Sequence, residues 1–343
     1  MSLKVDIYKK LGSFELSVSF ETENEVMALF GASGCGKSTI LKCVAGILKP
    51  DRGHIILDGK TLFDSEKRIN LTPQQRNVGY LFQQYALFPN MTVEQNIACG
   101  IHGKKDAERI ANVVKAMHLE GMEKKYPSQL SGGQQQRTAL ARILIGEPDI
   151  LMLDEPFSAL DTHLRYQMEQ EVKQVIKKFG KSTLLVSHDS DEVYRLSDRV
   201  AVMRDGLIEK IGDKKTIFMD PETINGAILT GYRNMSKVRV LSVGRVFAED
   251  WETELSVNGD TTGVTHVAAR SEKFQIGGTE NILICIVQEV ISNAFSYAVR
   301  VTPKHAGIEQ TFVIHMNEAH PELKEGNEVV VSIAKEDLVL LKN

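Results

Sequence analysis

Residues 31–39 read Gly-Ala-Ser-Gly-Cys-Gly-Lys-Ser-Thr, and this spacing of glycines and lysine is typical of a phosphate-binding loop. The apolar run at 26–30 predicts a buried strand, and apolar residues recur at helical spacing over 40–47 until Pro50. Glycines allow the backbone to wrap with its N–H groups pointing inward, and the start of a helix adds partial positive charge. We therefore expect a polyphosphate to bind at this turn.

The side chains of this loop have separate expected roles. We expect Lys37 to reach the β- and γ-phosphates, while the hydroxyl of Ser38 contacts Mg²⁺. The residues expected to contact the nucleotide here are Gly31, Ala32, Ser33, Gly34, Cys35, Gly36, Lys37, Ser38 and Thr39.

The composition is that of an ordinary globular protein. The chain has 343 residues, of which 42% are hydrophobic and 25% charged, so it is long enough for two domains with separate cores. No run of 18 or more apolar residues is present to cross a membrane. The first residues carry an early acid and no apolar core of signal-peptide length, so we expect a cytosolic protein.

Charge and cysteine content narrow the function further. The formal net charge is −4, and residues 234–343 carry 10 basic and 15 acidic side chains. Neither half is a basic surface, so we expect no nucleic-acid partner. The four cysteines show no Cys-x-x-Cys pairing, which favours reduced thiols over disulfides or a metal site.

The N-terminal region, residues 3–23, alternates apolar and polar positions. This period predicts antiparallel strands with one solvated face, and we expect them to flank the strand that leads into the loop. Phe14, in the turn between them, is a candidate to stack on a nucleotide base. The alternative, an ordinary core or turn aromatic, is equally compatible with the sequence.

A continuous apolar run at 150–153 ends in two carboxylates, Asp154 and Glu155. Such a run predicts a strand buried on both faces of a parallel sheet, and ligands bind beyond the carboxyl ends of these strands. We expect Asp154 to hold Mg²⁺, directly or through water. Glu155 would then stand beside the γ-phosphate, placed to orient or deprotonate a water molecule.

Two further predicted strands end in polar residues. Gln83 follows the strand at 78–82 and is a candidate to ligate Mg²⁺ or hold the attacking water, although alone it would be read as a solvated loop residue. His188 follows the apolar strand at 183–187 and could donate to the γ-phosphate. A histidine in this position is otherwise structural or exposed.

Residues 92–144 have helical periodicity, and Ser131, Gly132, Gly133 and Gln134 open the last helix of this region. A hydroxyl, flexible backbone amides and a helix dipole converge there, which predicts a second anion site. The alternative is a helix cap with a glycine turn.

The remainder of the chain changes character. Residues 200–209 predict a hairpin centred on Asp-Gly, and a short helical stretch follows Pro221. We place a domain boundary at 233. The predicted strands beyond it lie at 238–246, 264–269, 282–290, 297–301, 311–316 and 329–333. They indicate an all-β barrel or sandwich without catalytic residues.

Together these residues resemble the nucleotide-binding subunit of ABC transporters over roughly residues 1–230. The matching motifs are 31–39 (Walker A), Gln83 (Q-loop), 130–134 (LSGGQ), 150–155 (Walker B), 158–161 (D-loop) and His188 (H-loop). The resemblance implies an α/β fold: an ABC ATPase domain over 1–233 with a mixed-sheet core, an antiparallel β subdomain and a helical subdomain near 90–145. A β-rich regulatory domain of the TOBE or Mop type would cover 234–343.

The resemblance also implies ATP and Mg²⁺ as cofactors and a second copy of the chain as partner. In a head-to-tail dimer, Ser131 and Gly133 of one copy cap the γ-phosphate held by the loop of the other, and Asp161 links the two sites. Integral-membrane permease subunits would dock near Gln83 and residues 85–89, placing the protein peripherally on the cytoplasmic face of the membrane. A substrate-binding protein would be an indirect partner.

The expected substrate depends on shorter stretches. Residues 63–73, 76–80 and 10–14 resemble molybdate importer ATPases. Importers of sulfate, tungstate, iron or a sugar are alternatives. An alternative of another class is a soluble ABC ATPase that acts on DNA or ribosomes, although such proteins usually carry two cassettes or a long coiled-coil insertion.

Overall fold

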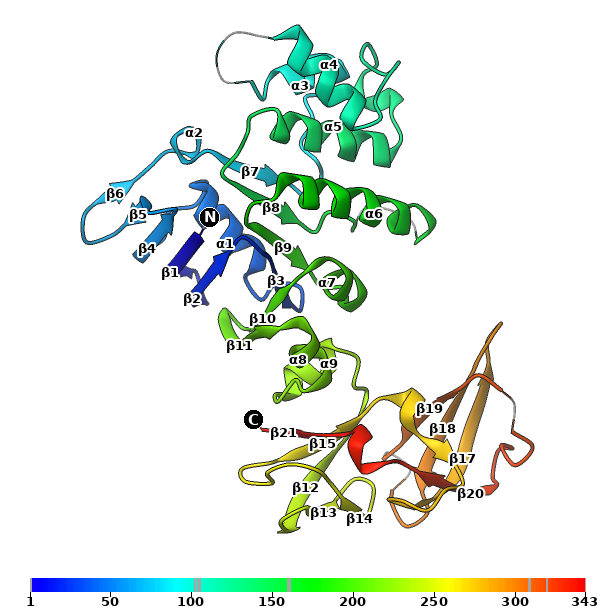
Figure 1. The fold of residues 1–343 in the computed structure, drawn as a ribbon. Helices are drawn as coiled ribbons and strands as arrows, with labels where there is room; N and C mark the ends of the chain where they lie inside the picture. The colour runs from blue at the N-terminus through cyan, green and yellow to red at the C-terminus, as the bar shows by residue number, and fades with distance from the viewer. Residues whose placement is uncertain are drawn as a thin grey trace. The chain divides into compact units, whose positions relative to one another are not determined.

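The computed structural model describes residues 2–101, 103, 106–158, 162–307, 310–318 and 320–342. The chain forms two compact units, Met1–Lys214 and Lys215–Asn343 (Figure 1). Within the described ranges, no helix is both long and apolar enough to cross a membrane. The domain boundary predicted at 233 stays a prediction. Residues 215–233 belong to the second compact unit.

The first unit contains a mixed sheet of eleven described strands in the order β6-β5-β4-β1-β2-β11-β10-β3-β9-β8-β7. Their bounds are β1 (Ser2–Leu11), β2 (Phe14–Glu23), β3 (Val26–Gly31), β4 (Arg52–Leu57), β5 (Lys60–Asp64), β6 (Ile69–Asn70), β7 (Val78–Leu81), β8 (Ile150–Asp154), β9 (Thr183–Ser187), β10 (Arg199–Arg204) and β11 (Leu207–Asp213).

Helices of this unit cover the sheet and form the predicted helical region. They are α1 (Lys37–Ala45), α2 (Pro73–Arg76), α3 (Val93–Ala98), α4 (Ala107–Ala116), α5 (Gly132–Leu144), α6 (Thr162–Phe179) and α7 (Ser190–Leu196). The helical periodicity of 92–144 is confirmed by α3, α4 and α5, whose apolar faces share one core.

The strands β10, β3, β9, β8 and β7 pair in parallel, and Figure 1 shows β3, β9, β8 and β7 side by side. Each of β3, β8 and β9 is buried along its whole length, as continuous apolar runs require. Because parallel strands present their carboxyl ends at one edge, the segments that follow β3, β9, β8 and β7 emerge together.

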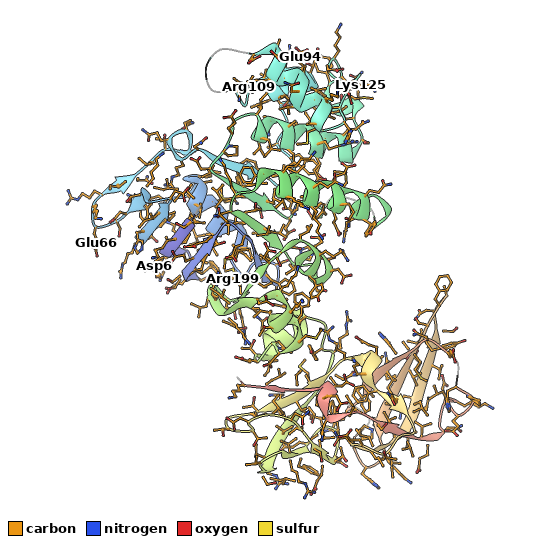
Figure 2. All side chains as sticks on the ribbon, viewed as in Figure 1. Asp6, Glu66, Glu94, Arg109, Lys125 and Arg199 are labelled. Carbon is orange, nitrogen blue, oxygen red and sulfur yellow. The ribbon has the colours of Figure 1, made fainter. Side chains whose placement is uncertain are left out.

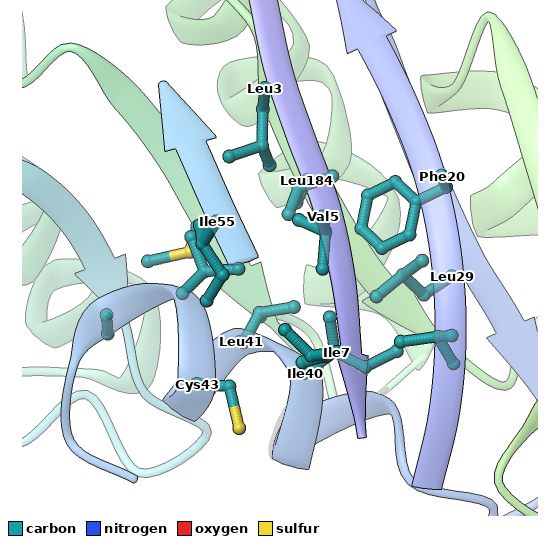
Figure 3. Packing of buried hydrophobic residues seen from close by; sticks show 14 of the residues in the cluster. Leu3, Val5, Ile7, Phe20, Leu29, Ile40, Leu41, Cys43, Ile55 and Leu184 are labelled. Atoms are coloured by element: carbon teal, nitrogen blue, oxygen red, sulfur yellow. The ribbon is translucent and has the colours of Figure 1, made fainter. Parts of the chain in front are cut away.

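The N-terminal strands β1 and β2 pair antiparallel, as the alternation predicts. The expectation that they flank the loop strand is wrong, because β3 lies between β10 and β9. The buried faces of β1 and β2 pack on α1 and the central strands instead (Figure 3). Alternation identifies a half-buried strand but not its neighbour in the sheet.

Figure 3 shows how this core holds α1. Ile40 and Leu41 of α1 lie among Val5 and Ile7 of β1 and Leu29 of β3, and all five are buried. Removing this much apolar surface from water is the main stabilising contribution to the unit. It fixes the helix that begins directly after the glycine-rich turn.

The hairpin predicted at 200–209 is confirmed by β10 and β11, which pair antiparallel around Asp205 and Gly206. Both turn residues have positive φ, 47° and 83°, which matches the twist of a two-residue hairpin. A Cβ on Gly206 would lie 2.0 Å from the carbonyl oxygen of Glu15, so glycine is required there.

The second unit begins with two short helices and continues as two five-stranded sheets. Its elements are α8 (Lys214–Met219), α9 (Ile224–Leu229), β12 (Asn234–Ser242), β13 (Arg245–Ala248), β14 (Thr253–Ser256), β15 (His266–Ala269), β16 (Gln275–Ile276), β17 (Leu283–Ser292), β18 (Tyr297–Pro303), β19 (Phe312–Met316), β20 (Glu328–Ser332) and β21 (Leu338–Leu341). The sheet orders are β14-β13-β12-β15-β21 and β16-β20-β17-β18-β19.

Both sheets contribute to a common core that includes Trp251, packed against Phe274 and Phe312 at ring-centroid distances of 5.9 and 5.8 Å. The all-β character predicted for this part is confirmed, but the single strand expected at 238–246 is wrong. Gly244 adopts a φ of 76°, and the chain turns there between β12 and β13.

Candidate functional site

The glycine-rich turn joins β3 to α1 as the sequence predicts. Gly36 has a φ of 106°, a backbone conformation that side chains disfavour, and a Cβ there would also press on the side-chain ends of Leu16 at 2.8 Å and Phe14 at 3.0 Å. The Lys37 ammonium group donates to the main-chain oxygens of Gly31 at 2.7 Å and Ala32 at 2.9 Å. The loop therefore wraps around its own lysine, which is buried.

Asp154, at the end of β8, lies beside the start of α1. The hydroxyl of Ser38 donates to Oδ1 of Asp154 at 2.7 Å, and the hydroxyl of Tyr80, on β7, donates to Oδ2 at 2.8 Å. Burial, together with the neighbouring Asp154 charge, raises the pKa of Tyr80, so this phenol stays protonated as a donor. Tyr80 was not predicted from the sequence.

The donor set at this point fits a hard cation. Ser38 offers a hydroxyl oxygen and Asp154 a carboxylate, and the amide of Gln83 lines one cavity together with Ser38. Oxygen donors of this kind are the ligands that Mg²⁺ prefers. This donor set contains a single carboxylate. Among the described residues, no group of three or more His, Cys, Asp or Glu side chains could hold a metal without other ligands.

Glu155 has polar partners on both sides. Its Oε2 accepts a hydrogen bond from Nε2 of Gln83 at 3.2 Å, and its Oε1 lies 3.2 Å from Nδ1 of His188. Its backbone has a φ of 46°, a left-handed conformation that costs a non-glycine residue about 1–2 kcal/mol. Strain of this kind is typical of functional positions.

A cavity of about 370 Å³ opens at this edge. Its lining residues are Phe14, Ser33, Gly34, Gly36, Lys37, Ser38, Thr39, Gln83 and Glu155. Four segments far apart in the sequence therefore meet at one site. His188 is half exposed next to Glu155.

The comparisons with known proteins agree with this geometry. A family model described as ABC transporter matches residues 15–158. An Fe(3+) ions import ATP-binding protein of Fusobacterium nucleatum subsp. nucleatum is 37% identical over 264 residues, which is 74% of this chain and 69% of that protein. The chain belongs to the ABC transporter ATP-binding family.

Other members of this family give further comparisons. A spermidine/putrescine import ATP-binding protein of Nitratidesulfovibrio vulgaris is 42% identical over 225 residues, covering 64% of this chain and 60% of that protein's length. A solved structure, described as a dimeric post-hydrolysis state of the ATP-binding cassette MJ0796 bound to ADP and Pi, has a TM-score of 0.53. It is 29% identical and covers 62% of this chain and 99% of the cassette.

Residues 131–134 of the LSGGQ motif lie elsewhere in the unit, at the start of α5. The Ser131 hydroxyl accepts from the main-chain N–H of Gln134 at 3.3 Å, and Oε1 of Gln134 accepts from the N–H of Ser131 at 3.0 Å. This is a capping box. A Cβ on Gly133 would lie 2.9 Å from Sδ of Met168, and none of residues 131–134 lines the cavity at the loop.

Two predicted nucleotide contacts remain open. Phe14 lies against Gly36 and lines the loop cavity, which is compatible with stacking on a base. Asp161 lies outside the described residues.

Cys35, another predicted nucleotide contact, is a buried residue of the loop itself. Burial raises the pKa of its thiol despite the nearby Lys37 charge.

The turn that carries His188 is anchored by residues that sequence reasoning missed. The hydroxyl of Ser187 donates to buried Glu192 at 2.7 Å and accepts from the N–H of Asp189 at 3.0 Å. Arg165, on α6, donates to Asp189 at 3.3 Å. The network therefore links α6 to the segment of His188, and no sequence periodicity indicated it.

A second cavity, of about 530 Å³, lies between β7 and the helical region. Its wall includes Phe82, Ala86, Phe88, Cys99 and Arg142. Phe88 and Cys99 are exposed. This is the neighbourhood, near Gln83 and residues 85–89, where the family resemblance implies that a membrane partner docks.

Proposed function

We propose that this chain is the ATP-hydrolysing subunit of an ABC importer. The observation that carries the proposal is the meeting of Glu155, Gln83 and His188 beside a cavity lined by Lys37 and Ser38. A triphosphate in the glycine-rich loop would present its terminal phosphate to these groups. The activity that follows is phosphoryl transfer to water.

Each side chain has a role that its position supports. Lys37 balances phosphate charge, since it already sits inside the loop. Ser38, Asp154 and Gln83 would hold Mg²⁺, which when bound neutralises the phosphate oxygens. Glu155 accepts the proton of the attacking water, because its carboxylate lies between an amide and an imidazole that restrict its orientation.

His188 completes the site by contacting the terminal phosphate. In its imidazolium form, its Nδ1 donates toward Glu155, 3.2 Å away, while its protonated Nε2 would donate to the terminal phosphate. The hydrogen bond between Asp189 N–H and the Ser187 hydroxyl, on either side of His188, restricts the direction of the imidazole. Preorganised groups of this kind supply electrostatic stabilisation without reorganisation during the reaction.

A second copy of the chain is part of the proposal. Residues 131–134 do not line the loop cavity of their own chain, and Ser131 is an exposed residue at a helix start. In a head-to-tail dimer, Ser131 and Gly133 would cap the nucleotide of the partner, and the family resemblance assigns Asp161 to the link between the two sites. The similar MJ0796 cassette is dimeric, which supports the dimer, while the head-to-tail orientation is part of the proposal.

The remaining parts of the proposal concern transport. We place the protein peripherally on the cytoplasmic face of the membrane, bound to permease subunits, with a β-rich regulatory domain after residue 233. Molybdate is the substrate that the resemblance favours through residues 63–73, 76–80 and 10–14. The names of the relatives point to ferric ion or spermidine and putrescine instead, so all three belong in the test.

The catalytic assignment is tested by the variant Glu155→Gln. We expect ATP binding to persist while turnover falls by about a hundredfold or more, because general-base catalysis is lost. Glu147→Gln is a matched control, since Glu147 also has a positive φ, 51°, and is exposed. Turnover of Glu155→Gln within a few-fold of Glu147→Gln would exclude Glu155 as the base.

The transport assignment needs the membrane partner. The tagged chain is isolated from membranes, and the co-purified complex is placed in vesicles with ATP. Uptake of molybdate, ferric ion and spermidine is then compared. Uptake of molybdate alone supports molybdate as the substrate. Uptake of ferric ion or spermidine instead makes that compound the substrate. If no membrane partner co-purifies, the importer assignment is contradicted.

A further inference from the structure

Arg142, near the end of α5, makes contacts that the roles above leave unexplained. Its Nη1 donates to the main-chain oxygen of Ala86 at 2.8 Å, and its Nη2 donates to that of Tyr85 at 3.1 Å. The guanidinium also lies over the ring of Phe88, 5.3 Å from the centroid. Burial lowers the pKa of Arg142, but an arginine stays charged, so both hydrogen bonds are charge-assisted.

The two carbonyls belong to residues in an unusual conformation. Tyr85 and Ala86 have φ values of 57° and 46°, so two consecutive non-glycine residues adopt the left-handed region. This region is unfavourable for residues with a Cβ, and such residues keep it only when surrounding contacts compensate. The fork of Arg142, which spans both peptide groups, is such a contact.

The same segment reaches the catalytic carboxylate at its other end. Gln83 donates to Glu155 at 3.2 Å and to Ser158 at 3.3 Å, and the hydroxyl of buried Tyr85 lies 3.4 Å from the main-chain oxygen of Pro156. Residues 83–88 therefore run from the Glu155 turn to the end of α5. Their backbone shape sets where the Gln83 amide lies.

We propose that Arg142 is a positioning residue for Gln83: by holding 85–86 in the left-handed conformation, it places the Gln83 amide against Glu155. This inference rests on the proposed ATPase activity only through the role of Gln83. Since α5 spans 13 residues and carries Ser131 at its start, one helix contacts both the capping motif and the Gln83 segment. A shift of α5 would therefore move both.

The test compares Arg142→Gln with Arg109→Gln in the full chain. Arg109, on α4 (Figure 2), donates to the main-chain oxygen of Ile145 at 2.8 Å, so it is an arginine that binds a carbonyl near the same helix end without touching 83–88. Hydrogen exchange of a peptide covering 82–90 reports the backbone conformation. ATPase kinetics report the position of Gln83.

For Arg142→Gln we expect exchange in this peptide to rise about tenfold and kcat to fall about tenfold, because two charge-assisted hydrogen bonds are lost. The KM for ATP should change less than about threefold, since the loop contacts persist. Exchange and kcat of Arg142→Lys should lie between those of the wild type and of Arg142→Gln, because an ammonium lacks the fork that spans both carbonyls. Arg109→Gln should match the wild type in both measurements.

A second substitution separates backbone control from simple packing. Ala86→Gly adopts positive φ without a steric penalty, so adding it to Arg142→Gln should recover at least about threefold in kcat. The proposal is overturned if Arg142→Gln matches Arg109→Gln, or if Ala86→Gly gives no recovery. If the wild type hydrolyses no ATP, the proposed function fails, while the exchange comparison still decides whether Arg142 holds the segment.

Discussion

Replacing Arg76 with Met should destabilise the first unit more than a typical single substitution. Arg76 is fully buried, and its Nε donates to Leu71 O at 2.9 Å. Its Nη1 donates to Cys43 O and Val44 O, each at 2.8 Å, and its Nη2 to Asn70 Oδ1 at 3.0 Å. Two of these acceptors are carbonyls in the last turn of α1, so the cation also complements the helix dipole.

The expected loss follows from these contacts. Four hydrogen bonds from a charged donor, at about 1.5–3 kcal/mol each, contribute about 8 kcal/mol. Removing the cation also removes the cost of burying it, about 3 kcal/mol after relaxation. Methionine refills much of the volume, so the net change in the free energy of unfolding should be about 5 kcal/mol.

Urea unfolding followed by far-ultraviolet circular dichroism measures this change, and hydrogen exchange across 37–45 reports α1 itself. We expect weaker protection of α1 and weaker ATP binding, because its first turn carries Lys37. Arg52→Met is the control, since Arg52 is exposed beside Tyr8. A loss below about 1.5 kcal/mol, with protection of α1 unchanged, would refute the reasoning.

Three other outcomes follow. Burial raises the pKa of Glu192 above its usual 4.5, so the folded state favours the protonated carboxyl. The stability that this protonated group contributes is present below about pH 4.5 and is lost as pH rises. Glu192→Gln should therefore become more stable relative to wild type above about pH 4.5, and a difference in urea midpoints that does not change with pH contradicts this. Exposed Cys99 should alkylate before buried Cys35 by mass spectrometry, and the reverse order contradicts it. Tyr80→Phe removes a hydrogen bond to Asp154 and should raise the Mg²⁺ needed for half-maximal ATPase about tenfold; an unchanged requirement contradicts it.

Local sequence was sufficient for the centre of the site. The run before Gly31 and the helical spacing after it predict the strand, turn and helix that β3 and α1 form. Continuous apolar runs before Asp154 and His188 predict buried parallel strands, and parallel pairing brings their ends together. These predictions rely on neighbours along the chain, where periodicity is informative.

Residues that act across the fold could not be predicted in this way. Arg76 and Arg142 bind main-chain carbonyls 32 and 57 positions away in the sequence, and a carbonyl acceptor requires no particular residue type. Tyr80 reads as one more apolar residue of its strand until Asp154 lies beside it. The prediction that β1 and β2 flank β3 was wrong for the same reason, since strand order depends on the whole sheet.

The position of Trp251 has an optical consequence. It is the one tryptophan in the sequence, and it lies in the core of the second unit between Phe274 and Phe312. Its fluorescence therefore reports loss of that core alone, whereas circular dichroism sums both units. In Arg76→Met, a dichroism transition that precedes the change in emission would separate the melting of the nucleotide-binding half from that of the β-rich half within a single titration.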